Sequence, residues 1–373
     1  MRIAMVLRLF SLHGGLELYA FQLVKGLLQR DHHVTVICES DETDFAHPHL
    51  TVRKFAPAAK GLSKSQKNRH YYEVASKAVA DAGPFDVVHS QHLGIAEFDA
   101  VTFHNHTVFR LSEVGLPWER QLNNFKVKFA QDYRSREEID GQLCHRGRCL
   151  IFPARTMADD FSNHYKFPSH LIAYVHPGAS LPKSIEPKAA GTDKTFNFLF
   201  VGKGYRKKGL DILLSACAQL KRKTPDFKLV IAGLRQKPLS KLQLSLLGIS
   251  KQVQYLGFQK DMNAVYQNAH SIILPSRIEP FGMAPIEGML AGLVPIVSQV
   301  CGVAEVLTDN VDSLILKNHL SAQELSDHMY TLMSNRQKWS TMSQQAAITA
   351  SKFTWEATVE QTLQAYSTIA VQH

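Results

Sequence analysis

Two carboxylates lie eight positions apart in the segment Glu279–Glu287 (EPFGMAPIE), on either side of a Phe-Gly turn. The apolar run Ser271–Ser276 precedes this segment, so we expect a strand, a tight loop and a helix that begins near Met283. Pro285 falls in the first helical turn, where its missing N–H is tolerated and its fixed φ fits. A helix start offers unpaired N–H groups and the positive end of the helix dipole, and it therefore suits a phosphate group.

We expect both glutamates to face one cleft, with Glu279 on the loop beside the phosphate and Glu287 about one turn into the helix. The backbone N–H groups of Phe281, Gly282 and Met283 would then approach the phosphate. Carboxylates accept hydrogen bonds from hydroxyl groups, so the pair suits a diphosphate that is flanked by hydroxyl-bearing sugars. The alternative is a solvated glutamate on a helix and an ordinary acid on a loop.

A basic turn forms the second candidate site in the segment Val201–Asp211 (VGKGYRKKGLD), which follows a predicted strand and opens a helix. Its glycines do not have the spacing of the dinucleotide fingerprint, and no Gly-Lys-Ser/Thr ends it as in a Walker loop. A glycine-flanked basic turn at a helix start can neutralise a diphosphate. The alternative is a basic turn that is merely solvated.

Two features of the first half of the chain could also contact a ligand. Gly14 and Gly15 lie between the first strand and the first helix, where glycine allows a close backbone approach or simply a tight turn. The segment Val101–His106 ends a strand at the predicted cleft and carries His104 and His106. A histidine at a strand end is often structural, so on its own this segment leaves both interpretations open.

The segment Glu279–Glu287 resembles the E-x7-E signature of the family 4 retaining glycosyltransferases, which have the two-domain GT-B fold. The resemblance extends over nearly the whole chain and is most specific from Phe196 to Leu307. Within the family, the chain most resembles the lipopolysaccharide core glucosyltransferases, and the run Ala158–Tyr165 shares in this similarity. The resemblance implies transfer of a hexose, glucose in the first instance, from a UDP-sugar to a lipopolysaccharide core or related glycolipid.

The resemblance also assigns roles to residues of this sequence. Lys208 and Arg206 would hold the donor diphosphate, although Lys207 is an alternative for the arginine. Glu279 would bind hydroxyls of the donor sugar and Glu287 those of the ribose, and the Gly14–Gly15 loop would border the donor phosphates and the acceptor. His104 would lie near the donor sugar, so Glu279, His104 and Lys208 are the expected catalytic residues. Retention in this family is attributed to front-face attack, and no protein nucleophile is assigned.

Alternating strands and helices predict an α/β protein with two doubly wound Rossmann-like domains facing across a cleft. We expect an acceptor-binding domain over residues 1–180, a linker near 178–191, and a donor-binding domain over 195–352. The resemblance implies that a helix over 355–373 packs back on the first domain. The predicted strands are Arg2–Leu7, His33–Cys38, Leu50–Phe55, Phe85–His89, Asp99–Phe103, Cys149–Ala154, Leu171–Val175, Phe196–Val201, Lys228–Ala232, Gln252–Leu256, Ser271–Leu274 and Val294–Val297.

The chain has 373 residues and a net charge of +9, with eleven Lys or Arg against two Asp between Lys203 and Lys241. Such an excess favours anionic partners, and no nucleic-acid-binding signature is present. The five cysteines do not suggest a disulfide framework, and the pair Cys144 and Cys149 lacks the further ligands of a zinc site. No Asp-x-Asp motif occurs, so we expect the diphosphate to be neutralised without a metal ion or other cofactor.

Aromatic and basic residues alternate between Val108 and Arg136, and they fit either contact with an anionic membrane or a buried helix with a basic outer face. No signal peptide or apolar run of membrane-spanning length is evident. We therefore expect a cytoplasmic protein that is peripheral on the inner membrane. The alternative functions are a transferase with another donor or acceptor, a non-catalytic sugar-nucleotide-binding protein, a nicotinamide dehydrogenase, and an epimerase or phosphorylase of the same fold.

Overall fold

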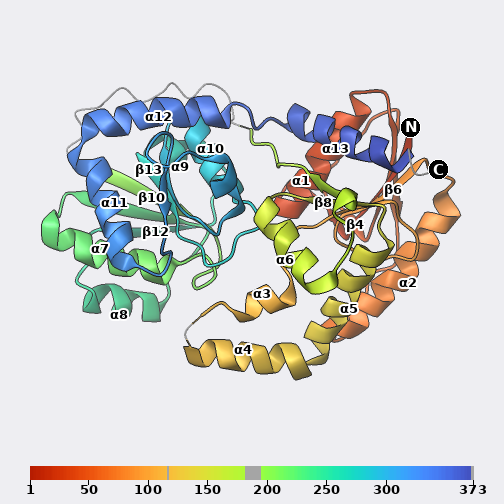
Figure 1. Cartoon of the computed structure of the whole chain (residues 1–373), viewed down its shortest axis with the longest axis horizontal. Helices are drawn as coiled ribbons and strands as arrows, with labels where there is room; N and C mark the ends of the chain where they lie inside the picture. Colours follow the sequence, from red (N-terminus) through yellow and green to blue (C-terminus); the bar gives the residue numbers. More distant parts are fainter. Residues whose placement is uncertain (116, 181–194, 371–373) are drawn as a thin grey trace. The chain divides into compact units, whose positions relative to one another are not determined.

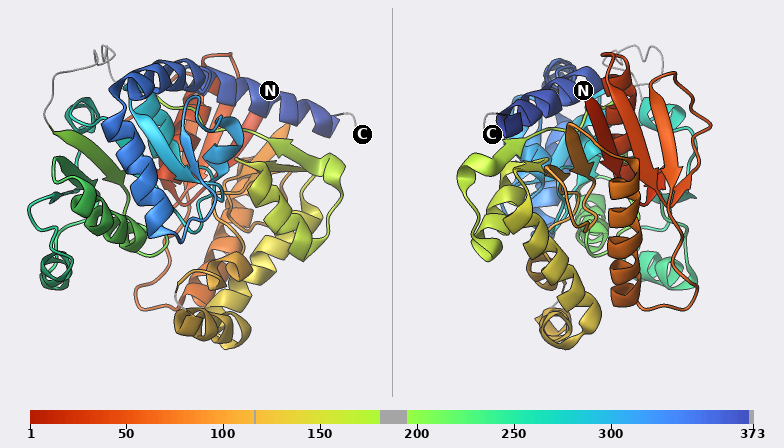
Figure 2. Two further views of the ribbon diagram at one scale, coloured as in Figure 1. Left: turned by 60° about the vertical axis from the view of Figure 1, so that its left-hand side comes forward. Right: turned by 90° about the vertical axis from the view of Figure 1, so that its right-hand side faces the viewer.

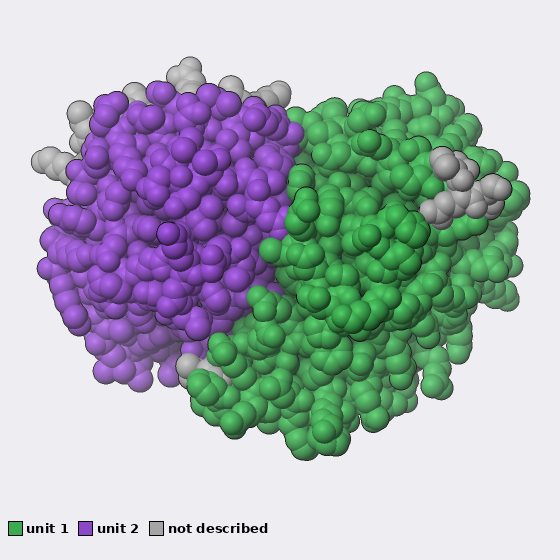
Figure 3. All heavy atoms as spheres, in the orientation of Figure 1, with its two compact units in different colours: residues 1–178, 354–373 green, residues 179–353 purple. Residues whose placement is uncertain are grey.

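The computed structural model describes residues 1–115, 117–180 and 195–370, and the chain divides into two compact units (Figure 3). Unit 1 comprises residues 1–178 and 354–373, and unit 2 comprises residues 179–353. Most of the predicted linker and the last three residues of the predicted C-terminal helix lie outside the described residues.

Unit 1 contains a seven-stranded parallel sheet in the order β5-β3-β1-β6-β7-β8-β9. From β1 the chain adds strands first on one side and then on the other, so the strand order reverses between β1 and β6. A small parallel pair, β2-β4, accompanies the sheet. The strands are β1 (Arg2–Val6), β2 (Leu9–Phe10), β3 (His33–Cys38), β4 (Ser40–Asp41), β5 (Leu50–Lys54), β6 (Val87–Ser90), β7 (Ala100–Thr102), β8 (Cys149–Phe152) and β9 (Ile172–Tyr174).

Helices cover the sheet of unit 1, and α13 joins it from the end of the chain (Figures 1 and 2). The helix α13 packs against α1 and β8, and a Cβ on Gly26 of α1 would meet Val359 Cγ2 at 2.4 Å. Glycine is therefore needed for this close approach. The helices are α1 (Gly15–Leu28), α2 (Lys64–Ala82), α3 (Val108–Ser112), α4 (Pro117–Phe129), α5 (Gln131–Arg146), α6 (Arg155–Tyr165), η1 (Ser169–Leu171) and α13 (Trp355–Ala370).

Unit 2 contains a six-stranded parallel sheet in the order β12-β11-β10-β13-β14-β15, which reverses between β10 and β13. Phenylalanines and aliphatic residues of the sheet pack against α7 and α11 in one large core. The strands are β10 (Phe196–Val201), β11 (Phe227–Ala232), β12 (Val253–Gly257), β13 (Ser271–Leu274), β14 (Val294–Ser298) and β15 (Leu314–Leu316). The helices are α7 (Leu210–Lys223), α8 (Pro238–Leu246), α9 (Asn263–Gln267), α10 (Met283–Leu290), η2 (Gly302–Val306), α11 (Ala322–Ser334) and α12 (Arg336–Ala350).

The predicted architecture of two parallel sheets with covering helices is confirmed. The strands β3, β10 and β13 have the predicted bounds, and the other predicted strands agree within two residues at each end. The short strands β2, β4 and β15 and the helices α11 and α12 were not predicted. Within the part of the chain that the structure describes, no helix is both long and apolar enough to cross a membrane.

Candidate functional site

The candidate donor site of unit 2 is built from the loops that follow β10 and β13, which flank the reversal of strand order. Ligands of doubly wound sheets bind at this place, beyond the carboxyl ends of the strands. Lys208 comes from the first loop and Glu279 from the second, and Lys208 Nζ donates a hydrogen bond to Glu279 Oε2 at 2.8 Å. The structure thus brings together the residues predicted to hold the diphosphate and the donor sugar.

A glycine allows these two loops to approach. Gly209, the N-cap of α7, has a φ of 71°, and a Cβ at this position would lie 2.0 Å from Pro275 O. Glycine is therefore required both for the left-handed backbone and for the space. Lys208 immediately precedes Gly209, so the backbone of the lysine lies beside this close approach of the two loops.

Arg277 holds the basic turn in place through a buried ion pair with Asp211, which is called the clamp below. Its Nη1 and Nη2 donate to the two carboxylate oxygens of Asp211 at 2.7 Å each, and Nη1 also donates to Arg206 O at 2.6 Å. Its backbone N–H donates to Lys207 O at 2.9 Å. Arg277 is buried, so this forked ion pair is a rigid support for the turn that carries Lys208.

Asp211 also accepts a hydrogen bond from Arg206 at 2.9 Å. The predicted contact of Arg206 with the diphosphate stays a prediction. Burial alone would raise the pKa of Asp211, but its bonds to Arg277 and Arg206 hold that pKa below its usual value. Sequence reasoning missed the supporting roles of Arg277 and Asp211. The only available signal was an arginine two positions before Glu279.

The helix α10 begins at Met283, as the sequence predicts, after Gly282 with a φ of 103°. Pro285 lies in the first turn, whose N–H groups have no partner within the helix itself. A Cβ on Gly282 would lie 3.5 Å from Glu279 Cγ, so the Glu279 side chain stands beside the helix start. The candidate site thus combines a cation, a carboxylate and the positive end of a helix dipole.

Glu287, on the second turn of α10, accepts a hydrogen bond from Tyr266 OH at 2.6 Å through its Oε2. Burial raises the pKa of Glu287, and the bond from Tyr266 partly offsets this effect. Glu287 Oε1 makes no hydrogen bond to the described residues and is available for a ligand. Tyr266 lies on α9 in no recognisable motif, and sequence reasoning did not find it.

In unit 1, Gly14 and Gly15 open α1, and Gly14 has a φ of 119° that favours glycine. No atom lies within 4 Å of a Cβ built on Gly15, so the space beside this turn is open. One turn further on, the ring of Tyr19 packs edge-on against His104 at a centroid distance of 5.2 Å. The glycine turn and His104 therefore lie along the same edge of the sheet.

The hydrogen bonds around His104 determine which ring nitrogen carries its proton. Gln91 Nε2 faces Met5 Sδ at 3.0 Å and His89 Nε2 at 3.3 Å, so Gln91 Oε1 faces His104 Nε2 at 2.8 Å. An amide oxygen only accepts, so the proton of His104 is on Nε2 and its Nδ1 is an acceptor. Burial, together with the nearby His92 and His89, holds the pKa of His104 well below its usual value, and the ring is neutral at pH 7.

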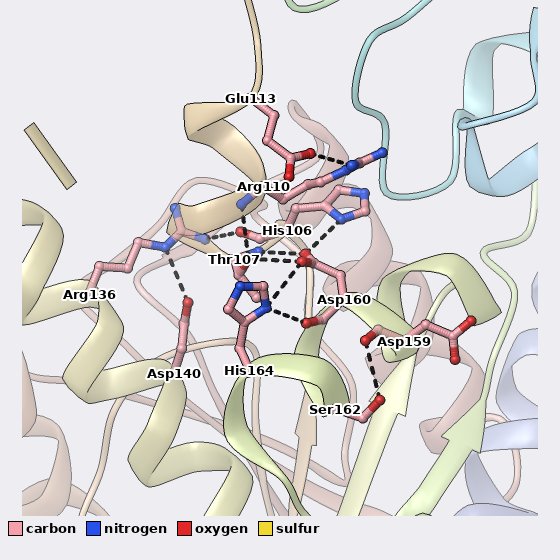
Figure 4. A network of polar contacts seen from close by, with 10 residues as sticks. All are labelled: His106, Thr107, Arg110, Glu113, Arg136, Asp140, Asp159, Asp160, Ser162 and His164. Atoms are coloured by element: carbon pink, nitrogen blue, oxygen red, sulfur yellow. Dashed lines mark hydrogen bonds and ion pairs between the residues drawn. The ribbon is translucent and has the colours of Figure 1, made fainter. Parts of the chain in front are cut away.

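The loop that carries His104 is anchored by a buried polar network (Figure 4). Asp160 accepts hydrogen bonds from His106 Nδ1 at 3.1 Å and from the N–H and hydroxyl of Thr107 at 3.0 Å each. Arg136 Nη2 donates to His106 O at 3.2 Å. His106 is 4% exposed and serves as an anchor of the loop, whereas His104 is partly exposed.

The helix α4 exposes an apolar stripe in the segment predicted to meet either a membrane or the protein core. Its apolar residues Trp118, Leu122, Phe125 and Phe129 are 46–62% exposed, and among the apolar residues only Val127 is buried. Their spacing places them on one face of the helix. The outer face is thus apolar with adjacent lysines, so a helix that buries its aromatic residues and exposes a basic face is excluded.

All five cysteines are free and buried, and burial raises the pKa of Cys149 to about 12. Over residues 1–115, 117–180 and 195–370, no three His, Cys, Asp or Glu side chains gather in a group that could hold a metal ion.

Two family models match the chain. The model of glycosyltransferase family 4 matches residues 13–181, and the model of glycosyl transferases group 1 matches residues 183–349. Together they span both units except for the ends of the chain. The chain therefore consists of a family 4 glycosyltransferase domain followed by a group 1 glycosyltransferase domain.

Curated relatives share low identity with this chain. The D-inositol 3-phosphate glycosyltransferase of Corynebacterium aurimucosum is 26% identical over 250 residues, which cover 61% of this chain and 58% of that enzyme. The match thus spans less than two thirds of the relative's length. The enzyme of the same name from Salinispora tropica is 22% identical, with 96% of this chain and 82% of that enzyme covered.

Solved structures identify the fold. Sucrose-phosphate synthase from Thermosynechococcus elongatus superposes with a TM-score of 0.80 at 18% identity, with both chains covered completely. WaaG, a glycosyltransferase involved in lipopolysaccharide biosynthesis, gives 0.76 at 17% identity over 96% of this chain and 98% of that one. Anabaena HepE in complex with UDP-glucose gives 0.71 at 18% identity, covering 98% and 99%. The predicted GT-B fold is confirmed.

Proposed function

We propose that the protein is a retaining hexosyltransferase that moves glucose from UDP-glucose to a sugar of a lipopolysaccharide core or related glycolipid. The ion pair between Lys208 and Glu279 beside the start of α10 is the observation that carries the proposal. It joins a group suited to a diphosphate with a group suited to sugar hydroxyls at the place where doubly wound sheets bind ligands. The UDP-glucose complex of HepE supports this donor, and the likeness to WaaG supports this acceptor.

The geometry suggests how these residues would act. The donor diphosphate draws Lys208 away from Glu279, and Lys208, Arg206 and the N–H groups at the start of α10 neutralise it. The freed Glu279 carboxylate then accepts hydrogen bonds from hexose hydroxyls. Glu287 accepts bonds from the ribose hydroxyls through its free Oε1.

The transfer itself needs no protein nucleophile. The acceptor oxygen bonds to C1 of the hexose on the face from which the UDP oxygen departs, and the acceptor proton passes to that departing phosphate oxygen. Charge stabilisation of the leaving UDP lowers the barrier. In this proposal His104 positions the hexose because its Nδ1 accepts a hydrogen bond from a hexose hydroxyl. We expect the reaction to run without a metal ion.

A different acceptor is the second candidate, since the curated relatives are D-inositol 3-phosphate glycosyltransferases. The apolar stripe of α4 favours a lipid-anchored acceptor, because aromatic residues with adjacent lysines bind anionic interfaces. We therefore propose that the protein is peripheral on the cytoplasmic face of the inner membrane.

Thermal-shift titrations with UDP, GDP, ADP, NAD and their sugar derivatives test the donor. A ligand at about 100 times its dissociation constant adds about 2.7 kcal/mol of stability, so a selective shift with UDP-glucose is expected. Lys208→Ala should abolish the shift, whereas Lys241→Ala, which removes an exposed lysine of α8, should retain it. A shift with NAD alone, or none with any sugar nucleotide, would refute the proposal.

Radiolabelled glucose transfer to truncated lipopolysaccharide and to inositol 3-phosphate then separates the two acceptors. Activity that survives dialysis against EDTA supports a reaction without metal. Activity lost on dialysis and restored by Mg²⁺ would contradict that expectation.

A further inference from the structure

A groove of about 770 Å³ lies between α2 and α5 in unit 1. The helices are tied together where Ser65 N–H donates to Asp132 at 3.1 Å and Asn68 Nδ2 donates to Ser135 Oγ at 3.2 Å. The groove volume falls in the range of small-ligand sites. None of the residues assigned to the donor contributes to this groove.

The groove presents a set of unengaged polar groups. Two guanidinium groups, two carboxylates and two primary amides on its walls have no side-chain hydrogen bond or ion pair within the described part of the chain. Two positive and two negative charges balance, so the groove is not built for a strongly charged anion. These groups are Arg69, Glu73, Gln131, Arg134, Glu138 and Gln142.

Apolar groups lie between these polar walls. Tyr72 and Ile139 both line the groove, and both approach Gly94, where an added Cβ would lie 3.7 Å from the ring and 3.2 Å from Ile139. A sugar offers hydroxyls to forked donors and acceptors and a C–H face to an aromatic ring. The combination of neutral overall charge, forked polar groups and an aromatic residue matches an oligosaccharide.

The groove lies towards the reacting edge of unit 1. Its α2 residues, from Ser65 to Glu73, belong to the first half of the helix, which starts after the carboxyl end of β5. The other wall, α5, carries Arg136 and Asp140, which bind His106 O and His92 in the loops beside His104 (Figure 4). One helix, α5, therefore lines the groove and also contacts the loops beside His104.

We propose that the groove between α2 and α5 binds the saccharide chain of the acceptor, beyond the sugar that receives the hexose. This proposal rests on the proposed function for its biological meaning. A single sugar cannot occupy both the groove and the edge near His104, so the acceptor is an oligosaccharide chain. The groove then selects the acceptor independently of the donor.

Direct binding tests the groove without the donor. The probe is core oligosaccharide released from truncated lipopolysaccharide by mild acid, titrated by calorimetry into the full-length protein, with free glucose as the single-sugar comparison. The double variant E73A/E138A should weaken binding about tenfold or more, since it removes one acceptor from each wall. Glu137→Ala, on the same helix but outside the groove, should bind like the wild type.

Transfer kinetics separate this proposal from the donor assignment. With UDP-glucose held saturating, E73A/E138A should raise the KM for the oligosaccharide and leave the thermal shift by UDP-glucose unchanged. If the wild type and E73A/E138A bind the oligosaccharide with equal affinity, or if neither binds it, the proposal that the groove binds the acceptor chain is refuted. A wild type that binds the oligosaccharide but no sugar nucleotide would instead refute the proposed function. Matching circular dichroism spectra and melting temperatures confirm that each variant is folded.

Discussion

Arg277→Met tests whether the buried clamp holds the turn that carries Lys208. Methionine has a similar length and is apolar, so the change removes the charge and the forked donors with little loss of volume. It deletes two bonds to Asp211 and one to Arg206 O. Asp211, with a side chain that is 11% exposed, would keep only Arg206 as its ionic partner.

The expected loss in the free energy of unfolding follows from these contacts. Removing one partner of a buried ion pair costs about 3–5 kcal/mol, and the remaining bond from Arg206 places the variant near the lower value, about 3 kcal/mol. For a domain of 150–250 residues this corresponds to a fall in melting temperature of about 6–12 °C. Arg277→Lys keeps the charge but not the fork, and it should lose less.

Acid titration provides a second signature. The pKa of Asp211 is below its usual value in the folded protein, because the arginines outweigh the opposing effect of burial. Its carboxylate therefore stabilises the wild type above the unfolded pKa of about 4 and loses that contribution as the pH falls towards the folded pKa. The gap in stability between wild type and Arg277→Met should narrow on acidification below about pH 4.

Calorimetry and denaturant unfolding at pH 7 and at pH 3 measure both effects, and titration with UDP-glucose measures donor affinity. The role of the clamp would be refuted if the free energy of unfolding of Arg277→Met lies within about 1 kcal/mol of the wild-type value. It would also be refuted if the difference in unfolding free energy stays constant with pH. Donor affinity that is unchanged despite the expected loss of stability would show that the clamp does not position Lys208.

Two further changes address the geometry of unit 2. Gly209→Ala should destabilise more than Gly248→Ala in thermal unfolding: both positions have a left-handed φ, which costs about 1–2 kcal/mol, but only the first would also collide with Pro275 O. Equal falls in melting temperature for the two variants would show that the loops at Gly209 and Pro275 move apart without a cost in stability. Tyr266→Phe removes the bond that lowers the pKa of Glu287, so donor binding should fail on acidification at a higher pH than in the wild type. If UDP-glucose affinity, measured over about pH 5–8, falls at the same pH in Tyr266→Phe and in the wild type, this role of Glu287 is contradicted.

Local sequence patterns were sufficient for most of the sheet. The apolar runs Phe196–Val201 and Ser271–Leu274 are bounded by polar or turn residues, and both became strands with the predicted bounds. The three-residue strand Leu314–Leu316 was not predicted, whereas the equally short Ala100–Thr102 and Ile172–Tyr174 lie within longer predicted runs. Strand prediction therefore succeeded where the runs were long enough to be distinctive.

The candidate site was predictable as separate loops but not as a network. The glycines and charges around Lys208 and Glu279 predicted a diphosphate site, whereas their ion pair joins residues 71 positions apart. The clamp from Arg277 to Asp211 likewise depends on the pairing of β10 with β13. The exposure of the apolar stripe of α4 could not be predicted from the sequence either, because aromatic residues at helical spacing pack equally well into a core.

The position of α13 has a consequence for biosynthesis. Unit 1 is completed by residues 354–373, so unit 2 is synthesised in full before unit 1 has all its parts. Until then the buried His89 lacks its 2.7 Å hydrogen bond to Tyr366, and the face of α1 at Gly26 is uncovered. Domains generally fold as units from the N-terminus during translation, but here unit 1 cannot be completed until the residues from 354 onward have been synthesised. A nascent chain stalled before residue 354 would therefore expose apolar surface that chaperones recognise.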